Sequence, residues 1–226
     1  MSEGIEGTTG AIPPITKGLR IKRNMSQQVK ICIPYYVGMF TDEFTEAIDR
    51  IKSPRELIVE SISHSQANEF VFHHHYLHRR LYIARNVSYG LYAGGFCVGV
   101  AMFGYPVWTT YQGLVPPMAP AECPELLRLC TVGGLPKNSE SWFIARCIKR
   151  MIPDWKRETG VSLKCITSFC DHSMGFLGAL YRASNFEEYR KTEGRPANPG
   201  LPHGKWGANM ASDKSSKTMY VYFLSR

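Results

Sequence analysis

The sequence predicts an α/β protein in which helices flank one mixed central sheet. Three observations lead to this class. Short apolar segments with strand composition recur along the chain, and segments with the apolar spacing of amphipathic helices lie between them. Their order is strand, helices, hairpin, strand–helix, strand–helix and strand, which favours a mixed sheet. The length of 226 residues is enough for one such domain, and a content of 44% apolar and 20% charged residues excludes wholesale disorder.

The N-terminal part lacks any apolar periodicity and is rich in Gly, Thr, Pro and Lys. We therefore expect residues 1–27 to form a flexible leader and residues 28–226 to form the folded domain. Met25 is a candidate alternative start, because strand composition begins soon after it, at residues 29–33.

Two helices and a hairpin are expected next. One helix begins after Thr41, whose hydroxyl can cap it, and ends at Ser53-Pro54. A second starts near Ser65 and carries apolar residues at helical spacing through Leu77. Residues 87–104 have strand composition on both sides of a Gly-Gly turn, which indicates a β-hairpin.

The second half alternates strands with helices. Residues 126–132 form a predicted strand, followed by a glycine turn and a helix from Ser139 that Pro153 kinks or ends. The apolar stripe of this helix is Ile144, Ile148, Met151 and Ile152, with Arg146, Lys149 and Arg150 largely on the other face.

A further buried strand is expected at residues 163–169, and Asp171 can cap the helix that follows it. On that helix one face carries Phe176, Leu177, Leu180 and Tyr181. Residues 187–218 read as a long polar insert with Gly, Pro and basic residues, before a last strand at 219–224.

The net charge of +8 is confined to the second half. Residues 1–125 hold 11 basic and 11 acidic residues, whereas residues 126–226 hold 16 and 8. This excess favours a polyanionic partner, although a merely soluble basic surface is the alternative. The lack of a long apolar stretch or a signal-like start argues against membrane and secreted classes. Seven cysteines without a CxxC pair favour free thiols in a reducing cytoplasm.

One helical segment carries a family resemblance. Ala179-Leu-Tyr-Arg-Ala-Ser-Asn-Phe186 resembles the A-x-x-Y-x-x-x-G-F signature of GNAT-type N-acyltransferases. The resemblance implies a splayed mixed sheet, with Tyr181 as general acid toward the leaving thiolate. Asn185 stands where the signature has glycine, a tolerable change because Asn also accepts left-handed backbone angles.

A second resemblance extends over roughly residues 65–190. The segments 127–129, 135–143, 168–171 and 181–186 are similar, in order and spacing, to those of the phage Mu-type Mom family, and His75-Tyr76 matches its His-Tyr pair. The resemblance implies an enzyme that converts adenine in DNA to N6-carbamoylmethyladenine. The modification protects phage DNA from host restriction, so the expected location is the host cytoplasm.

The expected catalytic residues are Asp171, Tyr181, His75 and Tyr76. Tyr181 is alternatively a core aromatic, and Asp171 a plain helix cap that can also orient or deprotonate adenine N6. His75 and Tyr76 line the substrate pocket by family resemblance. The histidines at 73–78 have spacing for a metal pair but no third ligand in register, so no metal site is predicted.

The donor site departs from the usual pattern. GNAT enzymes that use acetyl-CoA carry an R/Q-x-x-G-x-G/A loop, whereas this chain has Gly133-Gly-Leu-Pro-Lys-Asn-Ser-Glu140, in which proline removes one N–H donor. A phosphate can still bind at Lys137 and the helix N-terminus. The expected donor-binding residues are Arg128, Lys137, Asn138, Ser139 and Ser141.

Some of these residues have a structural alternative. Arg128 lies in an apolar strand and needs an anionic partner, either on the donor or in a structural acid such as Glu140. Ser139 and Ser141 are expected first as helix caps and second as donor-loop hydroxyls.

The insert supplies the expected DNA contacts. Basic side chains can meet phosphates, and an aromatic ring can stack on a displaced base. The predicted residues are Arg190, Lys191, Arg195, Lys205 and Trp206. A solvated loop is the alternative.

The implied product limits the donor. Its new bond joins adenine N6 to a methylene carbon, so direct acetyl transfer cannot form it. Glycyl-tRNA is one candidate donor, by glycyl transfer followed by rearrangement, and acetyl-CoA with iron-dependent oxidation is the other. The expected partners are double-stranded DNA and an aminoacyl-tRNA. A conventional acetyl-CoA-dependent N-acetyltransferase and a non-catalytic DNA-binding protein remain alternatives.

Overall fold

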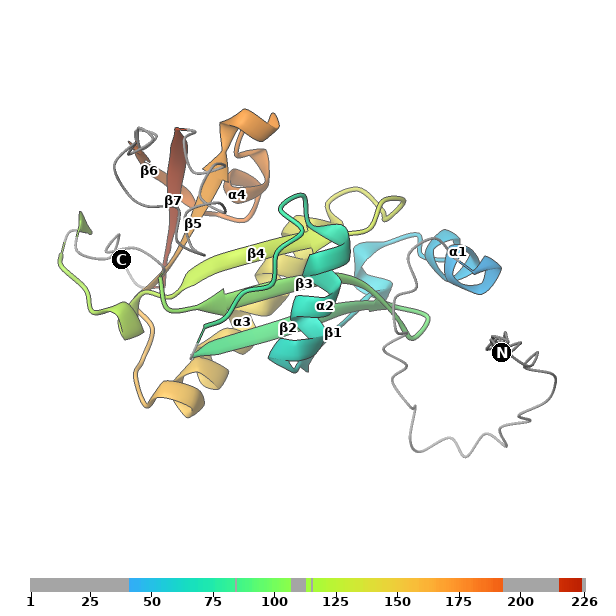
Figure 1. Ribbon diagram of the computed structural model, residues 1–226, viewed down its shortest axis with the longest axis horizontal. Helices are drawn as coiled ribbons and strands as arrows, with labels where there is room; N and C mark the ends of the chain where they lie inside the picture. The colour runs from blue at the N-terminus through green and yellow to red at the C-terminus, as the bar shows by residue number, and fades with distance from the viewer. Residues whose placement is uncertain (1–40, 84, 107–112, 115, 193–215, 225–226) are drawn as a thin grey trace, which may run out of the picture. The chain divides into compact units, whose positions relative to one another are not determined.

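A seven-stranded mixed sheet organises the part of the chain that the computed structural model describes, namely residues 41–83, 85–106, 113–114, 116–192 and 216–224 (Figure 1). The strand order is β1-β2-β3-β4-β5-β7-β6. The strands are β1 (Ile58–Ile62), β2 (Asn86–Ala93), β3 (Phe96–Gly104), β4 (Glu125–Thr131), β5 (Cys165–Asp171), β6 (Glu187–Thr192) and β7 (Lys217–Phe223). The expected leader, Met25 and the strand at 29–33 lie outside the described residues.

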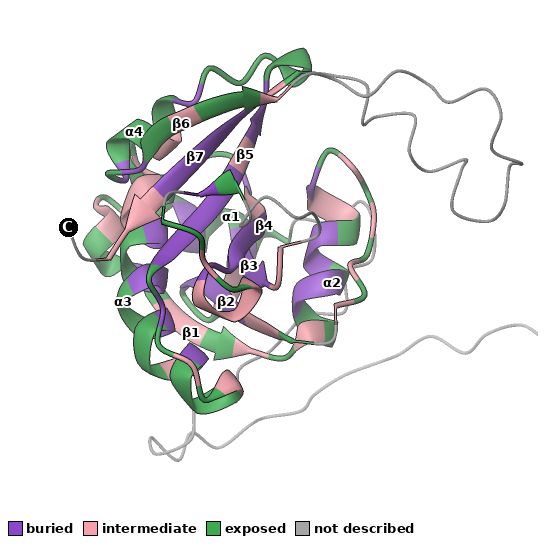
Figure 2. Cartoon of the chain, turned by 90° about the vertical axis from the view of Figure 1, so that its left-hand side faces the viewer, coloured by how far each residue is buried: buried purple, intermediate pink, exposed green. Residues whose placement is uncertain are grey.

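Helices cover both faces of this sheet. The helices are α1 (Asp42–Asp49), α2 (His64–His74), α3 (Ser139–Thr159) and α4 (Ala179–Ala183), with short 3-10 turns η1 (Pro54–Glu56), η3 (Pro120–Glu122) and η4 (His172–Met174). Helix α2 packs on β2, β3 and β4, and α3 packs on the opposite face against β1 and β2 (Figure 1, Figure 2). Within the described residues no helix is long and apolar enough to span a membrane.

The sheet divides between β4 and β5. Strands β1 to β4 pair antiparallel, and β5, β7 and β6 do the same, but β4 and β5 run parallel and pair only at Glu125 and Thr167. By contrast, β2 and β3 pair along their whole length. The fold-class prediction, a mixed and splayed sheet flanked by helices, is confirmed.

Capping by side-chain oxygens begins both early helices, and the cap at Thr41 was predicted from the sequence. Thr41 Oγ1 accepts a hydrogen bond from the N–H of Phe44 at 3.2 Å. Helix α2 begins at His64, just before the expected start, because Ser63 and Gln66 form a reciprocal capping box. Strand β1 was not predicted, since its mixed exposure gives no clean alternation.

Helix α3 buries most of its predicted stripe. Ile144, Ile148 and Met151 are buried, but Ile152 is 43% exposed and does not belong to the stripe. Pro153 lies inside the helix and does not end it. Near its C-terminal end, Trp155 is fully buried and donates its indole N–H to the carbonyl of Ala121 at 2.7 Å.

The prediction of one helix that begins after Asp171 and carries Phe176, Leu177, Leu180 and Tyr181 on one face is wrong. Asp171 caps only η4, and α4 starts at Ala179. Two glycines interrupt the helix, because Gly175 and Gly178 adopt the left-handed φ values of 78° and 71°. Phe176 and Leu177 consequently lie in a loop and share no helical face with Tyr181, whereas Asn185 has the expected left-handed φ of 62°.

The prediction of a polar insert at residues 187–218 is wrong at both of its ends. Residues 187–192 form β6, an edge strand that pairs antiparallel with β7, and β7 begins at Lys217. Charged residues dominate β6 and most of its side chains are exposed, so the segment lacks an apolar alternation. Residues 193–215 lie outside the described part.

The Trp155 contact gives a test of the fold. Trp155→Phe should lower the free energy of unfolding by about 2 kcal/mol, because it leaves a small cavity and removes the donor to a buried carbonyl. Ile152→Ala is the control on the same helix and should change it by no more than about 0.5 kcal/mol. Urea unfolding followed by circular dichroism measures both, and equal losses would contradict the assigned burial.

Candidate active site

A polar cluster occupies the place where β4 and β5 part. Arg128 comes from β4, Ser168 from β5 and Tyr181 from α4, while His75 and Tyr76 follow the last turn of α2. We call these five residues, with Glu125 at the start of β4, the Arg128 cluster.

Tyr181 makes two hydrogen bonds at its hydroxyl. The oxygen lies 3.0 Å from Ser168 Oγ, and the hydroxyl reaches the carbonyl of Phe169 at 3.2 Å. Ser168 Oγ in turn lies 3.1 Å from the carbonyl of Leu126 and thereby bridges β5 to β4. Burial raises the pKa of Tyr181 above its usual value of 10, although the bond from Ser168 opposes this shift. The phenol is therefore a protonated, weak acid at neutral pH.

A second tyrosine fixes the plane of Tyr181. The Tyr220 ring of β7 stacks on it, with centroids 4.9 Å apart and planes 18° from parallel. The Tyr220 hydroxyl accepts a hydrogen bond from Arg182 Nη1 at 3.0 Å. Gly178 leaves room for this hydroxyl, because a Cβ there would collide with it. Tyr181 is thus held by packing as well as by hydrogen bonds.

Arg128 is a cation with unused donor capacity. Its Nη1 donates to the carbonyl of Leu127 at 2.6 Å, and its buried Nε has no hydrogen-bond partner among the described residues. Burial lowers the pKa of the guanidinium, while Tyr76 and Glu125 oppose this shift. Glu140, the example given for a structural acid partner, instead accepts from Thr131 Oγ1 at 3.1 Å, and the nearby acid is Glu125.

His75 is held in its neutral form. Burial, and then the charges of Arg128 and His78, lower the pKa of His75 from 6.5 to about 3. Its Nδ1 accepts a hydrogen bond from the N–H of Leu77 at 3.2 Å, so Nε2 carries the proton. The ring stacks on Tyr76 with centroids 4.3 Å apart. His75 can therefore donate, but not accept, a hydrogen bond at Nε2.

Asp171 is buried at the end of β5 and acts as a cap. Its Oδ1 accepts hydrogen bonds from the N–H of Ser173 at 3.0 Å and from Ser173 Oγ at 2.6 Å. This confirms the capping role predicted from the sequence, although the capped element is η4. A role toward adenine stays a prediction.

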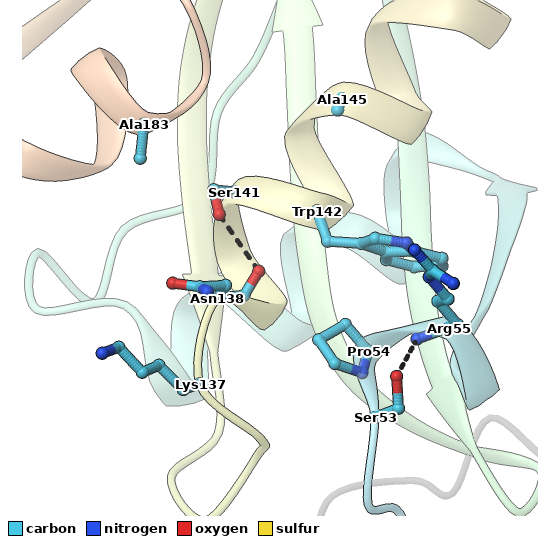
Figure 3. A pocket seen from close by; sticks show the side chains of 9 residues that line it. All are labelled: Ser53, Pro54, Arg55, Lys137, Asn138, Ser141, Trp142, Ala145 and Ala183. Atoms are coloured by element: carbon cyan, nitrogen blue, oxygen red, sulfur yellow. Dashed lines mark hydrogen bonds between the residues drawn. The ribbon is translucent and has the colours of Figure 1, made fainter.

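A separate hollow of about 350 Å³ lies at the N-terminus of α3 (Figure 3). Its lining combines two cations, an aromatic ring and small polar groups, which suits a phosphate joined to a flat ring. The lining residues are Ser53, Pro54, Arg55, Lys137, Asn138, Ser141, Trp142, Ala145 and Ala183.

The predicted donor-binding residues are divided between these two places. Lys137, Asn138 and Ser141 line the hollow, whereas Arg128 belongs to the cluster. The side chains of Ser139 and Ser141 do not cap α3, because their hydroxyls donate to the carbonyls of Pro136 and Asn138 at 2.7 and 3.1 Å. The N-cap is Asn138, with a left-handed φ of 69°.

The predicted DNA-binding residues are only partly placed. Arg190 and Lys191 are exposed on the edge strand β6, while Arg195, Lys205 and Trp206 lie outside the described residues. In the part of the chain that is described, no three His, Cys, Asp or Glu side chains gather as a metal site requires.

Several residues of the Arg128 cluster and of the hollow at α3 were not predicted from the sequence. Ser168 lies in the strand that was predicted as buried, and Tyr220 lies in the last predicted strand, but neither hydroxyl was assigned to the site. Glu125 directly precedes the predicted strand at 126–132, and its carboxylate was likewise not assigned to the site. Arg55 and Trp142 come from distant segments, so only the fold brings them together.

The chain was compared with known families and structures. The model of the Mom protein family matches residues 56–219, and no curated protein matches the sequence. Among solved structures, the chain is similar to YncA, a putative acetyltransferase from Salmonella typhimurium with its cofactor acetyl-CoA, at a TM-score of 0.46 and 11% identity over 76% of this chain and 95% of that chain.

Two further structures have similar values. A Bacillus subtilis acetyltransferase in complex with CoA has a TM-score of 0.46 and 11% identity over 75% of this chain and 99% of that chain. A GNAT family acetyltransferase from Elizabethkingia anophelis with acetyl-CoA bound has a TM-score of 0.43 and 11% identity over 75% and 99%.

The neutral state of His75 has a measurable consequence. The unfolded chain binds a proton at this residue near pH 6.5 and the folded chain only near pH 3, so stability falls as the pH drops through this window. Between pH 7 and pH 5 the residue should remove about 2 kcal/mol from the free energy of unfolding. Urea unfolding of wild type and His75→Asn should show a flatter pH dependence for the variant. A His75 imidazole NMR signal that titrates between pH 6 and 7 would contradict this assignment.

Proposed function

Because the chain belongs to the Mom protein family, we propose that it is a transferase that converts adenine in DNA to N6-carbamoylmethyladenine. The observation that carries the proposal is the Arg128 cluster, which lies within the matched residues 56–219. It joins a protonated phenol, a half-buried guanidinium and a neutral imidazole donor where a sheet opens. Such groups suit transfer of an acyl group through an oxyanion. We infer that the modification protects phage DNA from restriction in the host cytoplasm.

The acceptor is double-stranded DNA. Adenine N6 takes part in base pairing, so the base must leave the helix before it reacts, which costs a few kcal/mol. The excess of basic residues in positions 126–226 supports a polyanionic substrate. The exposed Arg190 and Lys191 of β6 are candidates for phosphate contacts.

The donor is proposed to be a glycyl ester, as in glycyl-tRNA. Adenine N6 attacks the glycyl carbonyl, and the ribose oxygen leaves with a proton. The free glycyl amine then attacks C6 through a five-membered ring, and the original N6 departs from C6 as the terminal amide. Every atom of the product is accounted for without an oxidant or a reductant.

The residues of the cluster have distinct parts in this scheme. Arg128 stabilises the oxyanion that forms at the glycyl carbonyl through the charge of its guanidinium. Tyr181 gives its proton to the leaving oxygen. Its raised pKa makes it a weak acid, which is better matched to a strongly basic ribose alkoxide than to a thiolate. His75 Nε2 and Tyr76 position the adenine, and Asp171 orients N6.

The hollow at α3 fits the phosphate-bearing part of the donor. Arg55 and Lys137 offer charge, and Trp142 offers a surface for a base. Coenzyme A carries the same groups, so acetyl-CoA is the alternative donor for a conventional N-acetyltransferase. An acetyl-CoA route to the carbamoylmethyl product would need an oxidant for the methyl carbon, with a metal such as iron, and also a separate source of the amide nitrogen.

The product and the donor can be tested together. DNA co-expressed with the protein should contain an adenine nucleoside that is heavier by about 57 Da, the mass of the one C₂H₃NO unit that glycyl transfer adds. With nitrogen-15 glycine, the label should lie on the nitrogen attached to C6. Mass spectrometry with fragmentation locates it. Label in the terminal amide would overturn the rearrangement, and full activity of iron-free protein would overturn the oxidative route.

The role of Tyr181 gives a second test. Tyr181→Phe keeps the ring stacked on Tyr220 but removes the proton donor, so the rate should fall by about 10²-fold or more without loss of DNA binding. Tyr82→Phe changes a residue that is 88% exposed and serves as the matched control. Unchanged protection of DNA by Tyr181→Phe would favour the non-catalytic DNA-binding alternative.

A further inference from the structure

The last residue of η4 and the loop that joins η4 to α4 expose three large apolar side chains within four residues. Met174 is 46% exposed, Phe176 49% and Leu177 74%. Clustered apolar exposure of this kind indicates a contact surface, whereas single exposed apolar residues are ordinary.

The backbone of this loop is nevertheless held in place. The carbonyl of Phe176 accepts a hydrogen bond from His172 Nδ1 at 2.9 Å, and the carbonyl of Leu177 accepts one from Arg182 Nη2 at 2.8 Å. The next residue, Gly178, lies against the Tyr220 hydroxyl. The loop therefore presents its side chains from a fixed frame, so little conformational entropy is lost when they bind.

The loop also borders the Arg128 cluster. The Phe176 ring lies 5.8 Å from the ring of Tyr76, at an angle of 57°. Tyr76 stacks on His75 and lies close enough to Arg128 to raise its pKa. An aromatic wall made of Phe176 and Tyr76 thus connects the exposed loop to the reacting groups.

We propose that this loop opens the DNA duplex: Leu177 enters the base stack at the target adenine, and Phe176 with Tyr76 receives the extruded base. The inference rests on the proposed function. Leu and Phe are among the side chains that wedge between base steps in other DNA-bending proteins. Aromatic rings stack on unpaired bases whatever their sequence.

The proposed role of Leu177 is tested by comparing paired DNA with DNA in which the target adenine is already unpaired. Leu177→Ala should lower the rate of modification by about tenfold or more on fully paired DNA, because the variant must open the pair unaided. On a duplex whose target adenine lies opposite an abasic site, the variant should match wild type. Ile152→Ala, an apolar truncation at an exposed position of α3, should behave as wild type on both substrates. Equal losses of Leu177→Ala on both substrates, or no loss on either, would overturn the proposal.

Substitution of Phe176 should have a different kinetic effect, because in this proposal Phe176 contacts the base only after extrusion. Phe176→Ala should raise KM on both substrates, and opening of the pair should not rescue it. An unchanged KM on both substrates would remove Phe176 from the proposed pocket.

A binding measurement separates this inference from the proposed chemistry. Short duplexes carry 2-aminopurine in place of one adenine at successive positions, and its fluorescence rises when the base leaves the stack. Wild type should cause this rise at one position, and Leu177→Ala should not. If wild type gives the rise but no modified adenine forms, the chemistry is wrong and the wedge stands. If wild type gives no rise at any position, the wedge is overturned whether or not modification occurs.

Discussion

Strands β4 and β5 share a single pairing position, Glu125 with Thr167, and beyond it their backbones separate. Every buried backbone group along this gap must still find a partner, since an unpaired one costs free energy. Ser168 Oγ lies 3.1 Å from the carbonyl of Leu126 across the gap and 3.0 Å from the Tyr181 hydroxyl, so its single proton can serve either acceptor. Tyr181 reaches in from α4 to Ser168 and to the carbonyl of Phe169. The separation of β4 from β5 thus leaves room for these side chains and leaves backbone carbonyls to which they can donate hydrogen bonds.

Different interactions hold the residues on the two sides of the gap between β4 and β5. On the β5 side, Tyr181, Tyr220 and Arg182 form a stacked and hydrogen-bonded unit that also fixes the loop carrying Leu177. On the β4 side, burial keeps His75 neutral and leaves a donor of Arg128 unused. A site built this way has its dipoles oriented before any substrate arrives, which is the condition for stabilising a developing charge without reorganisation.

The sequence was most informative where periodicity and capping act locally. The hairpin, helix α3 and the Thr41 cap follow from spacing and from one hydroxyl. The helix expected after Asp171 failed because Gly175 and Gly178 take left-handed angles, and glycine alone does not reveal its φ. Strand β6 was missed because an edge strand is stabilised by its neighbour β7 rather than by its own apolar residues. Ser168 meets Tyr181 only through the fold, so no local pattern contained that contact.

Helix α4 links the two candidate substrate sites, and this limits how the reaction can be arranged. Tyr181 faces the Arg128 cluster, whereas Ala183 lines the hollow at the start of α3. Residues two apart on a helix point in different directions, so the five-residue helix separates two chemical environments. A donor whose phosphates occupy the hollow must therefore extend past α4 to bring its carbonyl to Tyr181. In the proposed reaction, an adenine held by Phe176 and Tyr76 would reach the same hydroxyl from the side of α2. In that arrangement the two substrates meet at the Tyr181 phenol, which β5 holds by hydrogen bonds and β7 holds through the stacked ring of Tyr220.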